Sequence, residues 1–471
     1  MSLESLYTAD EMRAAEAAYP GYPETTGELM ERAGAAAARL ALELYPDARR
    51  FALVCGGGSN GGDGRVMARH LEAAGREALV VDAKAGETDL GAPDAIVDAL
   101  FGTGFSGVPR PEAAALIERI DGAGVPVLAI DLPSGVDAST GEIAGAVVHA
   151  TATVTFHGRK VGLAVAPGRF HAGDVHVADI GLDPAETEHR LVTAEILGSV
   201  PRRGARDNKY TAGHVLVVGG SRGLTGAPCL TAMATLRADA GYVTVAAPAS
   251  TLPVFEQRLL EAVKRPLPDT GGEVAAGAAD AVLALAGRAH ALALGPGLGR
   301  GEAARELVRR VLAEIALPAV VDADALHGLE PGDWPAPRVL TPHEGELGRL
   351  LGRPSAEIAA HRLASVREAA DRFGCVVLLK GEDTLVAAPG GGVLVVAHGL
   401  PSLATAGTGD VLTGIVAAFL AKGMEPRLAA AAAAAAQQRA AVEAPQRAGL
   451  VASDLVEALP RALATTGSPP A

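Results

Sequence analysis

The sequence has little cysteine and few aromatic residues. Only three of its 471 residues are cysteine, at Cys55, Cys229 and Cys375, and no two of them form a CxxC pair. Their wide spacing in or near apolar segments argues against a disulfide framework or a cysteine metal site and favours small buried thiols in a reducing compartment. Aromatic residues make up 3% of the chain. Alanine, valine and leucine must therefore fill much of the core.

Long apolar runs and basic blocks are also missing. No stretch of about 18 uncharged apolar residues occurs, so no transmembrane helix is expected. The N-terminal segment carries acids early and has no apolar core, so no signal peptide is expected either. The formal net charge is −14, which argues against nucleic acid as the main partner. We therefore expect a cytoplasmic protein with no membrane and no nucleic-acid partner.

Glycine is abundant, at 58 of 471 residues, against a usual share of about 7%. Apolar residues make up 49% and charged residues 20%, a balance typical of a globular chain. One core rarely grows beyond about 250–300 residues, so at least two domains are expected. The positions of the glycines then become the main question.

Both halves alternate short β-branched runs with helical stretches, which predicts parallel sheets covered on both faces and an α/β fold class. The first half has expected helices at 65–75 and 111–124, and a polar segment at 182–210 is expected to be a linker. Ala429–Ala436 is read as a packed helix, with a low-complexity tract as the alternative. Thr465–Ala471 is expected to be a frayed tail. The expected strands are 51–55, 78–82, 95–101, 125–131, 151–156 and 174–180, then 214–220, 242–248, 289–297, 318–324, 338–342 and 375–381.

The first glycine cluster, CGGGSNGGDG, holds six glycines between Cys55 and Gly64, after a strand and before a helix. Such a loop lets the backbone approach a ligand, and the helix N-terminus offers free N–H groups to a phosphate. The alternative is a loose strand-to-helix turn. The cluster matches neither the GxGxxG nor the GxxxxGK[ST] fingerprint.

Two acids, Asp98 and Asp131, end later strands of the same half. Each could be a helix cap or a buried hydrogen-bonded carboxylate. Together with Asn60 and Ser134 in matching loops, they make a site for a hard cation plausible. Lys160, just after an apolar strand, is either a solvated rim charge or, beside a phosphate or carbanion site, an acid or electrostatic group.

Four motifs occur in a fixed order between Leu6 and Gly181: SNGGDG, VDALFGTG, DLPSGVD and KVGL. This half resembles the NAD(P)HX epimerase domain, a Rossmann-like three-layer sandwich that acts on hydrated nicotinamide cofactors. Ser59 stands where that family usually has Asn. The resemblance implies that Asn60, Asp98 and Ser134 bind potassium, that Asp131 contacts the substrate, and that Asp131 and Lys160 are the acid/base candidates. It implies that the dinucleotide is held by Ser59, Asn60, Gly61, Gly62, Asp63, Gly102, Thr103, Gly104, Phe105, Ser106, Gly107 and Val108.

The most informative segment of the second half is ATAGTGDVLTG, which places Gly407, Gly409 and Asp410 at the start of a long apolar helix. Phosphoryl transfer needs donors for developing charge and a base for the attacking hydroxyl. A helix N-terminus supplies the donors and an aspartate supplies the base. The alternative is an ordinary N-cap with glycines for packing.

Six motifs between Val192 and Leu459 resemble the ADP/ATP-dependent NAD(P)HX dehydratase family, which has a ribokinase-like α/β/α fold: GGS…GAP, GPGLG, DADAL, LTPHEGE, LKGEDT and ATAGTGDVLTG. The resemblance implies that Asp410 removes the proton of the hydrate hydroxyl so that it can be phosphorylated and eliminated. Mg²⁺ is implied with ADP or ATP, and ADP is favoured by resemblance alone. The implied substrate contacts are Ala227, Gly297, His343 and Asp410, and the implied nucleotide contacts are Lys380, Gly381, Glu382, Asp383, Thr384 and Gly409.

The second half departs from that family at several positions. Ala406 replaces a glycine, Ser402-Leu403 replaces Gly-Met, and NKYTAGH stands where HKGTYGH is common. Glu382-Asp383 adds acids to a loop that is usually small and neutral. These acids would either repel phosphates or assist magnesium.

We therefore predict a fused repair enzyme with an epimerase in residues 1–189 and a dehydratase in residues 190–471. Its substrates would be NADHX, NADPHX and ADP or ATP, and we expect a homo-oligomer. One rival hypothesis is a small-molecule hydroxyl kinase fused to a regulatory domain. Another is a non-catalytic dinucleotide-binding or scaffold protein, although Asp131, Lys160 and Asp410 are all present.

Overall fold

The computed structural model describes residues 3–397, 399–446 and 448–464. The chain divides into two compact units. One is Ser5–Arg190, and the other runs from Leu191 onward and takes in Leu3 and Glu4. The expected tail, Thr465–Ala471, lies outside the described residues.

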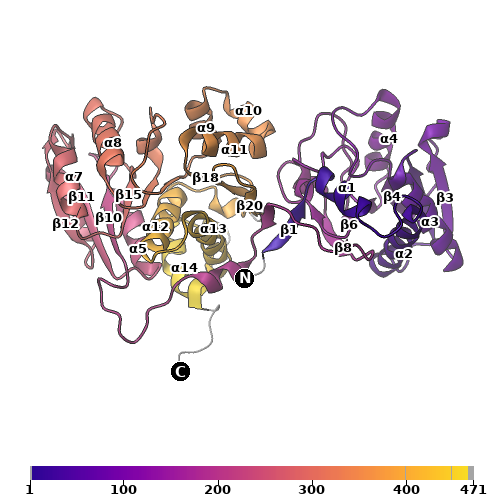
Figure 1. Cartoon of the computed structure of the whole chain (residues 1–471), viewed down its shortest axis with the longest axis horizontal. Helices are drawn as coiled ribbons and strands as arrows, with labels where there is room; N and C mark the ends of the chain where they lie inside the picture. The colour runs from indigo at the N-terminus through magenta and orange to yellow at the C-terminus, as the bar shows by residue number, and fades with distance from the viewer. Residues whose placement is uncertain (1–2, 398, 447, 465–471) are drawn as a thin grey trace. The chain divides into compact units, whose positions relative to one another are not determined.

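The Ser5–Arg190 unit is built on a six-stranded parallel sheet (Figure 1). Alternate residues of β2 enter two separate cores, because successive side chains of a strand point to opposite faces. Phe51 and Leu53 pack with α2 (Thr26–Leu44) and α3 (Ser59–Ala73), whereas Ala52 and Val54 pack with α4 (Pro111–Gly122). The predicted three-layer sandwich is confirmed. In spatial order the strands are β3 (Glu77–Asp82), β2 (Arg50–Cys55), β4 (Ala95–Ala99), β5 (Val127–Ile130), β6 (Ala152–Phe156) and β8 (Asp174–Ala178).

The glycine cluster after β2 differs from the expected loop, because α3 begins at Ser59 and contains its second half. Glycine is unfavourable inside a helix, so close packing must account for it. A Cβ on Gly62 would lie 2.6 Å from the sulfur of Met30, and one on Gly64 would lie 2.8 Å from the sulfur of Cys55. These two glycines therefore let α3 approach α2 and β2, and only residues 56–58 form a loop.

The Leu191-onward unit has a longer sheet. Its strands run parallel from β12 to β18, and β19 and β20 then add antiparallel. All six strands predicted in this half are present. In spatial order the strands are β12 (Val263–Leu267), β11 (Tyr242–Pro248), β10 (His214–Val218), β15 (Ala291–Leu294), β16 (Ala319–Val321), β17 (Arg338–Leu340), β18 (Val376–Leu379), β19 (Thr384–Ala387) and β20 (Val393–Val396).

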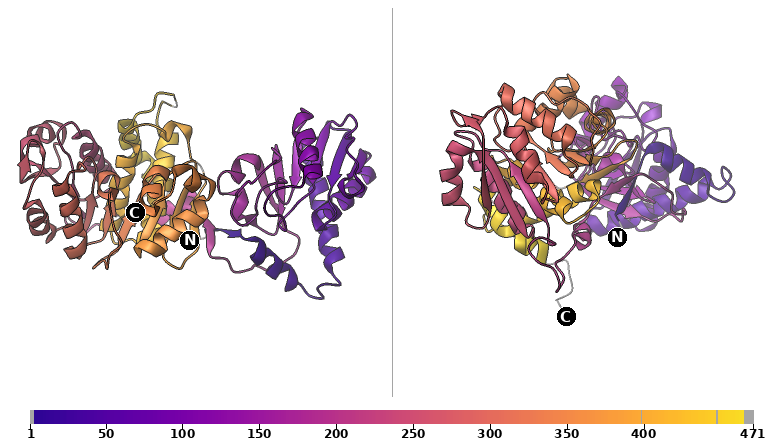
Figure 2. Two further views of the ribbon diagram at one scale, coloured as in Figure 1. Left: turned by 90° about the horizontal axis from the view of Figure 1, so that it is seen from above. Right: turned by 60° about the vertical axis from the view of Figure 1, so that its left-hand side comes forward.

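One face of this sheet packs against several helices in a single apolar core. Ala429–Ala436 all lie buried in α13, so the packed-helix interpretation is confirmed. Figure 2 shows the yellow helices α12 to α14 gathered along one side of the unit. The other helices include α8 (Glu302–Glu314), α9 (Glu344–Leu351) and α11 (Arg362–Phe373). The α-helices that contribute to this core are α5 (Gly226–Arg237), α6 (Leu252–Arg258), α12 (Thr408–Ala421), α13 (Pro426–Glu443) and α14 (Ala452–Ala464).

The segment 182–210 is more structured than the predicted linker. It contains β9 (His189–Leu191) and a short 3-10 helix at Ala194–Ser199. Ile196 and Leu197 on this helix are fully buried in the core of the Leu191-onward unit. The segment was predicted to be a linker because most of its residues are polar, and two apolar residues alone do not make a recognisable pattern.

The three cysteines are free, and Cys55 and Cys375 are buried, as predicted. Within the described ranges, none of the helices has the length and apolar character needed to span a membrane.

The contact between α5 and α12 gives a stability prediction. A Cβ on Gly414 of α12 would overlap the carbonyl oxygen of Thr231 and lie 2.8 Å from the Cβ of Ala234. We expect Gly414→Ala to lower the free energy of unfolding by about 1–3 kcal/mol, because overpacking forces the two helices apart. Gly226→Ala is the matched control, since nothing lies within 4 Å of its added Cβ. Urea denaturation measures both, and equal midpoints would contradict this account of the α5–α12 contact.

Candidate functional site

The Ser5–Arg190 unit brings its predicted polar residues to one edge of the sheet. Asp98 lies near the end of β4, and Asp131 follows β5. The carboxyl ends of parallel strands meet at one edge, where open α/β sheets bind ligands. A Cβ on Gly102 would lie 3.2 Å from both the Oδ1 of Asn60 and the Oδ2 of Asp131, so these two side chains lie close together beside Gly102.

Asp131 is the most constrained residue of this site. Its φ is +67°, which is strained for a residue with a Cβ and is frequent at functional sites. The backbone N–H of Thr103 donates to Oδ2 at 3.0 Å, and the Thr103 hydroxyl donates to the same oxygen. Burial works to raise the pKa of Asp131, but the charge of Lys160 and these hydrogen bonds outweigh it and hold that pKa below its usual range.

Lys160 is 1% exposed, so the alternative of a solvated rim charge is wrong. Its ammonium lies 2.6 Å from Oδ1 of Asp131 and donates to the hydroxyl of Thr155 at 2.9 Å and the carbonyl of Phe156 at 2.8 Å. An ammonium has three donors. All three are engaged, so Lys160 holds Asp131 in place in this state.

Asn60, Asp98 and Ser134 form a buried oxygen-rich cluster. Asp98 is fully buried, and it accepts hydrogen bonds from the hydroxyl of Ser134 at 2.6 Å, its N–H at 2.7 Å and the N–H of Leu100 at 3.2 Å. Within the described part of the chain no cationic side chain pairs with Asp98, and burial raises its pKa to about 6. Oδ1 of Asn60 is buried without a hydrogen-bond partner, although Nδ2 donates to the carbonyl of Phe101 at 2.9 Å. One carboxylate and neutral oxygens suit a hard cation.

Two more carboxyl groups face the Asp131–Lys160 pair. The pKa of Asp63 is raised to about 8, chiefly by burial; the charges of Asp131 and Glu16 contribute to this rise and the charge of Lys160 opposes it. Burial also raises the pKa of Glu16, with Asp131 contributing. Glu16 lies on α1 (Ala9–Ala17), far from every motif, so the sequence carried no signal for it.

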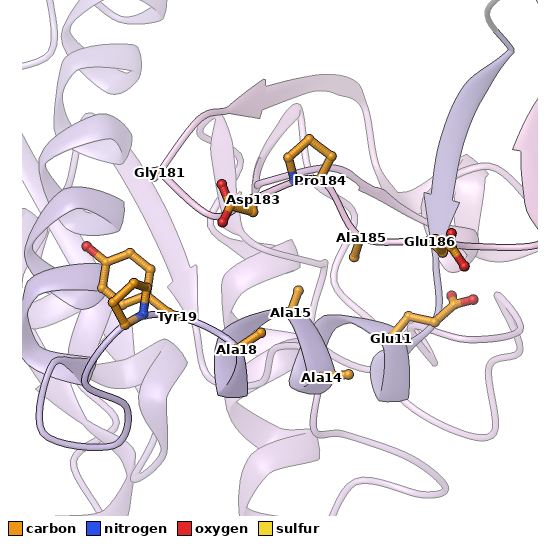
Figure 3. Close-up of a pocket in the computed structure, with 11 residues that line it drawn as sticks. Glu11, Ala14, Ala15, Ala18, Tyr19, Gly181, Asp183, Pro184, Ala185 and Glu186 are labelled. Carbon is orange, nitrogen blue, oxygen red and sulfur yellow. The ribbon is translucent and has the colours of Figure 1, made fainter.

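The predicted loop 102–108 lies partly open. Phe105 stacks on Phe101 at 4.6 Å, whereas Val108 is 68% exposed. A cavity of about 400 Å³ lies in the same unit between α1 and the segment Gly181–Glu186 (Figure 3). None of the predicted site residues lines this cavity.

In the Leu191-onward unit, the glycine-rich segment begins a helix as predicted. Gly407 has a φ of +91°, a conformation that favours glycine, and α12 begins at Thr408. Gly409 and Asp410 thus lie in its first turn, where backbone N–H groups are free to meet an anion. Burial raises the pKa of Asp410 to about 7; the charge of Asp322 adds to the rise and Lys380 opposes it. A carboxylate with such a pKa is suited to act as a base near neutral pH.

Lys380 directly follows β18, and its ammonium lies near the start of α12, 3.4 Å from where a Cβ on Gly409 would be. Its ammonium lies 2.9 Å from Oδ1 of Asp322 and 3.9 Å from Oε2 of Glu346. Burial disfavours the ammonium form, but the charges of Asp322 and Glu346 hold the pKa of Lys380 above its usual value. The lysine therefore stays charged beside the first turn of α12.

The predicted substrate contacts come from neighbouring turns. His343 is the N-cap of α9, where its Nδ1 accepts from the N–H of Gly345 at 3.0 Å, and its side chain is 56% exposed. It forms a parallel bridge with Lys380. Gly297 has a φ of +60°, and a Cβ there would overlap the carbonyl oxygen of Leu224. Ala227 lies in the first turn of α5.

The acid pair at 382–383 divides in two. Asp383 is fully buried, with Oδ1 accepting from Nε and Nη2 of Arg362 at 2.9 and 2.6 Å, and Arg362 also pairs with Glu344. Its carboxylate is thus committed to the fold and neither repels phosphates nor assists magnesium. Glu382 is exposed.

Several residues of this region were missed as site residues. The DADAL motif contained Asp322 without indicating its contacts, and Arg362 lies in no motif. Their partners come from distant segments, which local patterns do not connect. The missed residues are Asp322, Glu346, Arg362 and Thr413.

Comparison with known proteins adds an independent view. A family model described as NAD(P)H-hydrate dehydratase matches residues 215–461, and one described as YjeF-related protein N-terminus matches residues 26–92 and 77–162. A bifunctional NAD(P)H-hydrate repair enzyme Nnr from Moorella thermoacetica is 41% identical, covering 88% of this chain and 87% of the relative. One of the same name from Escherichia coli is 34% identical, covering 93% and 89%.

Solved structures resemble the second unit. The ADP/ATP-dependent NAD(P)H-hydrate dehydratase of Bacillus subtilis, co-crystallised with ATP/Mg²⁺, is 29% identical with a TM-score of 0.51 and covers 57% of this chain and 96% of that chain. A ribokinase-like protein of Enterococcus faecalis is 24% identical with a TM-score of 0.52, covering 61% and 99%, and supports the fold alone. Both sequence resemblances are confirmed, and the chain belongs to the family of bifunctional NAD(P)H-hydrate repair enzymes.

Proposed function

We propose that the chain interconverts the R and S hydrates of NADH and NADPH and dehydrates the S form at the expense of ADP or ATP. Residues 1–189 would be the epimerase and residues 190–471 the dehydratase. The observation that carries the proposal is the partly buried Asp410, at the N-terminus of α12 and beside the Lys380–Asp322 pair. Family membership over most of the chain supports the substrate class.

In the epimerase half, Asp131 is the group that would contact the hydrated ring. Lys160 and Thr103 hold its carboxylate ionised and fixed in orientation. Asp63, with its raised pKa, would supply a proton to the same region. Two carboxyl groups with pKa values moved in opposite directions can act as base and acid in one site.

Potassium fits the cluster of Asn60, Asp98 and Ser134. The unpartnered Oδ1 of Asn60 and the unpaired charge of Asp98 are what a bound monovalent cation would satisfy. When bound, the ion would supply a fixed positive charge near the dinucleotide. The protein's own contribution is to hold the oxygens of Asn60, Asp98 and Ser134 close together.

In the dehydratase half, Asp410 would take the proton from the hydrate hydroxyl as that oxygen attacks the terminal phosphorus of the nucleotide. The N–H groups at the start of α12 and the Lys380 ammonium would stabilise the charge on the transferring phosphoryl group. The phosphorylated hydrate would then lose phosphate from one ring carbon and a proton from the neighbouring carbon, which restores the double bond of the dihydronicotinamide ring. The 380–384 turn and Gly409 would hold the nucleotide.

Magnesium would enter with the nucleotide. Among the described residues no group of His, Cys, Asp and Glu could hold a metal on its own. Mg²⁺ is usually held by substrate phosphates, water and one or two carboxylates, so a protein cage is not required. The choice of ADP, the homo-oligomeric state and the cytoplasmic location stay predictions from the sequence.

The function is tested by absorbance at about 340 nm, where the reduced cofactor absorbs and its hydrate does not. We expect recovery when the protein is mixed with an R,S mixture of NADH hydrate, Mg²⁺ and ADP or ATP. Full conversion, beyond the S fraction, requires both halves. No recovery with either nucleotide would overturn the proposal.

Asp410→Asn separates the two activities. We expect nucleotide-dependent dehydration to fall at least about 10²–10⁴-fold, the usual contribution of a general base. Epimerisation, followed by chromatography of the two hydrates, should be unchanged because it depends on the other unit. Equal loss of both activities would contradict two independent sites.

Potassium should act on one half only. We expect exchange of potassium for a quaternary ammonium ion to slow epimerisation while dehydration of the pure S hydrate continues. Ser134→Ala should lower the apparent affinity for potassium by about 10–100-fold, because the Ser134 hydroxyl holds the Asp98 carboxylate in place. A titration of epimerisation rate against potassium measures this, and unchanged titration in the variant would contradict the proposed ligand set.

A further inference from the structure

Asp322 is a buried carboxylate whose two oxygens have different partners. It directly follows β16 and is 2% exposed. Oδ1 lies 2.9 Å from the ammonium of Lys380, and Oδ2 accepts from the hydroxyl of Thr413 on α12 at 2.7 Å. One carboxylate thus joins the nucleotide turn to the helix that carries Asp410.

Three charged features converge at this point. A Cβ on Gly409 would lie 3.4 Å from the Lys380 ammonium and 3.9 Å from Oδ2 of Asp322. The N-terminus of α12 carries partial positive charge, and a lysine ammonium held against it is repelled. A carboxylate between them offsets that repulsion. Glu346, at 3.9 Å from Lys380, is a second anion but a more distant one.

The backbone fixes Asp322 independently of its side chain. Its N–H donates to the carbonyl of Leu294 at 3.1 Å, and its carbonyl accepts from the N–H of Ala325 at 3.1 Å. Ala323, the next residue, has a φ of +53°, which is unfavourable for alanine. Strain of this kind persists where the surrounding structure holds it and is frequent at functional sites.

We propose that Asp322 is a positioning residue of the dehydratase site. It holds the Lys380 ammonium at the N-terminus of α12, within reach of the phosphoryl group that is transferred to the hydroxyl activated by Asp410. This role rests on the proposed dehydratase function. No other described carboxylate lies as close to the Lys380 ammonium. Asp322 is therefore the residue that would keep Lys380 directed at the transferring phosphoryl group.

The charged groups that face Asp410 fix the sign of the test. They are Asp322 and Asp324, whose negative charges raise its pKa, and Lys380, whose positive charge lowers it; burial is the largest cause of the rise. Asp410 must be ionised to act as a base, so activity should rise with pH through about 7. Removing the charge of Asp322 removes one cause of the rise. The acid limb of kcat/KM should therefore move to lower pH.

The test compares Asp322→Asn with wild type and with Thr413→Val, in the full-length chain. For Asp322→Asn we expect kcat to fall at least about tenfold because Lys380 is no longer fixed, with a smaller change in the KM for nucleotide. Its acid limb should shift down by about one pH unit. Thr413→Val loses the other contact but keeps the charge, so its acid limb should stay in place. Epimerisation by the same protein reports whether each variant is folded.

A second measurement does not need turnover. In protein labelled with ¹³C at the aspartate carboxyl carbons, the Asp410 resonance can be assigned with Asp410→Asn and titrated in wild type and Asp322→Asn. A downward shift of the midpoint in Asp322→Asn supports the inference even if wild type fails to dehydrate the hydrate, which would overturn only the proposed function. An unchanged midpoint with an unchanged kcat would overturn the inference, as would an equal shift in Thr413→Val.

Discussion

A buried carboxylate in contact with a buried or half-buried lysine, at the end of a parallel strand, organises the chemistry of both units. In one unit the pair is Asp131–Lys160 at 2.6 Å, and in the other it is Asp322–Lys380 at 2.9 Å. Neither charge would be stable alone away from water, because the desolvation cost of an unpaired ion is several kcal/mol even after relaxation. Each pair needs further hydrogen bonds, which the Thr103, Thr155 and Thr413 side chains supply. The surrounding loops are arranged around that requirement.

These pairs also explain why carboxyl groups of the same type behave differently within one site. Lys160 and the Thr103 donors keep Asp131 ionised, whereas burial and the charges of Asp131 and Glu16 raise the pKa of Asp63 to about 8. In the other unit Lys380 is held by Asp322, so it only partly offsets the effects that raise the pKa of Asp410 to about 7. A proton can therefore move near neutral pH at Asp410, while the neighbouring Asp322 carboxylate is engaged by Lys380 and Thr413. Placing one carboxylate against a lysine leaves the next one free to titrate.

The sequence predicted the parts of this arrangement that local patterns encode. Short β-branched runs ending in acids predicted the strands and placed Asp98 and Asp131 at strand ends, because a parallel strand buried on both faces is a continuous apolar run. The glycine-rich segment placed Asp410 at the start of α12. The start of α3 was predicted too late, because packing against Met30 and Cys55 overrides the low helix propensity of glycine. Asp383 was interpreted by its place in a nucleotide loop, yet its partner Arg362 lies 21 residues earlier on α11. Such pairings depend on tertiary contacts and leave no periodic trace.

The net charge of −14 poses a last question, since both proposed substrates are anions. Long-range steering by the whole molecule would oppose binding, but such fields are screened over a Debye length of about 8–10 Å in physiological salt. Within the site the charged groups are closer together than a Debye length. Gly409 lies in the first turn of α12, and a Cβ on it would lie 3.4 Å from the Lys380 ammonium. The backbone N–H groups add favourable partial charge without adding a side chain, which is why glycine, rather than lysine or arginine, is concentrated at these strand ends. Gly62, Gly64 and Gly414 serve close packing. Under the proposed function, the glycines at the strand ends and the deficit of positive charge would be two consequences of one way of binding phosphate.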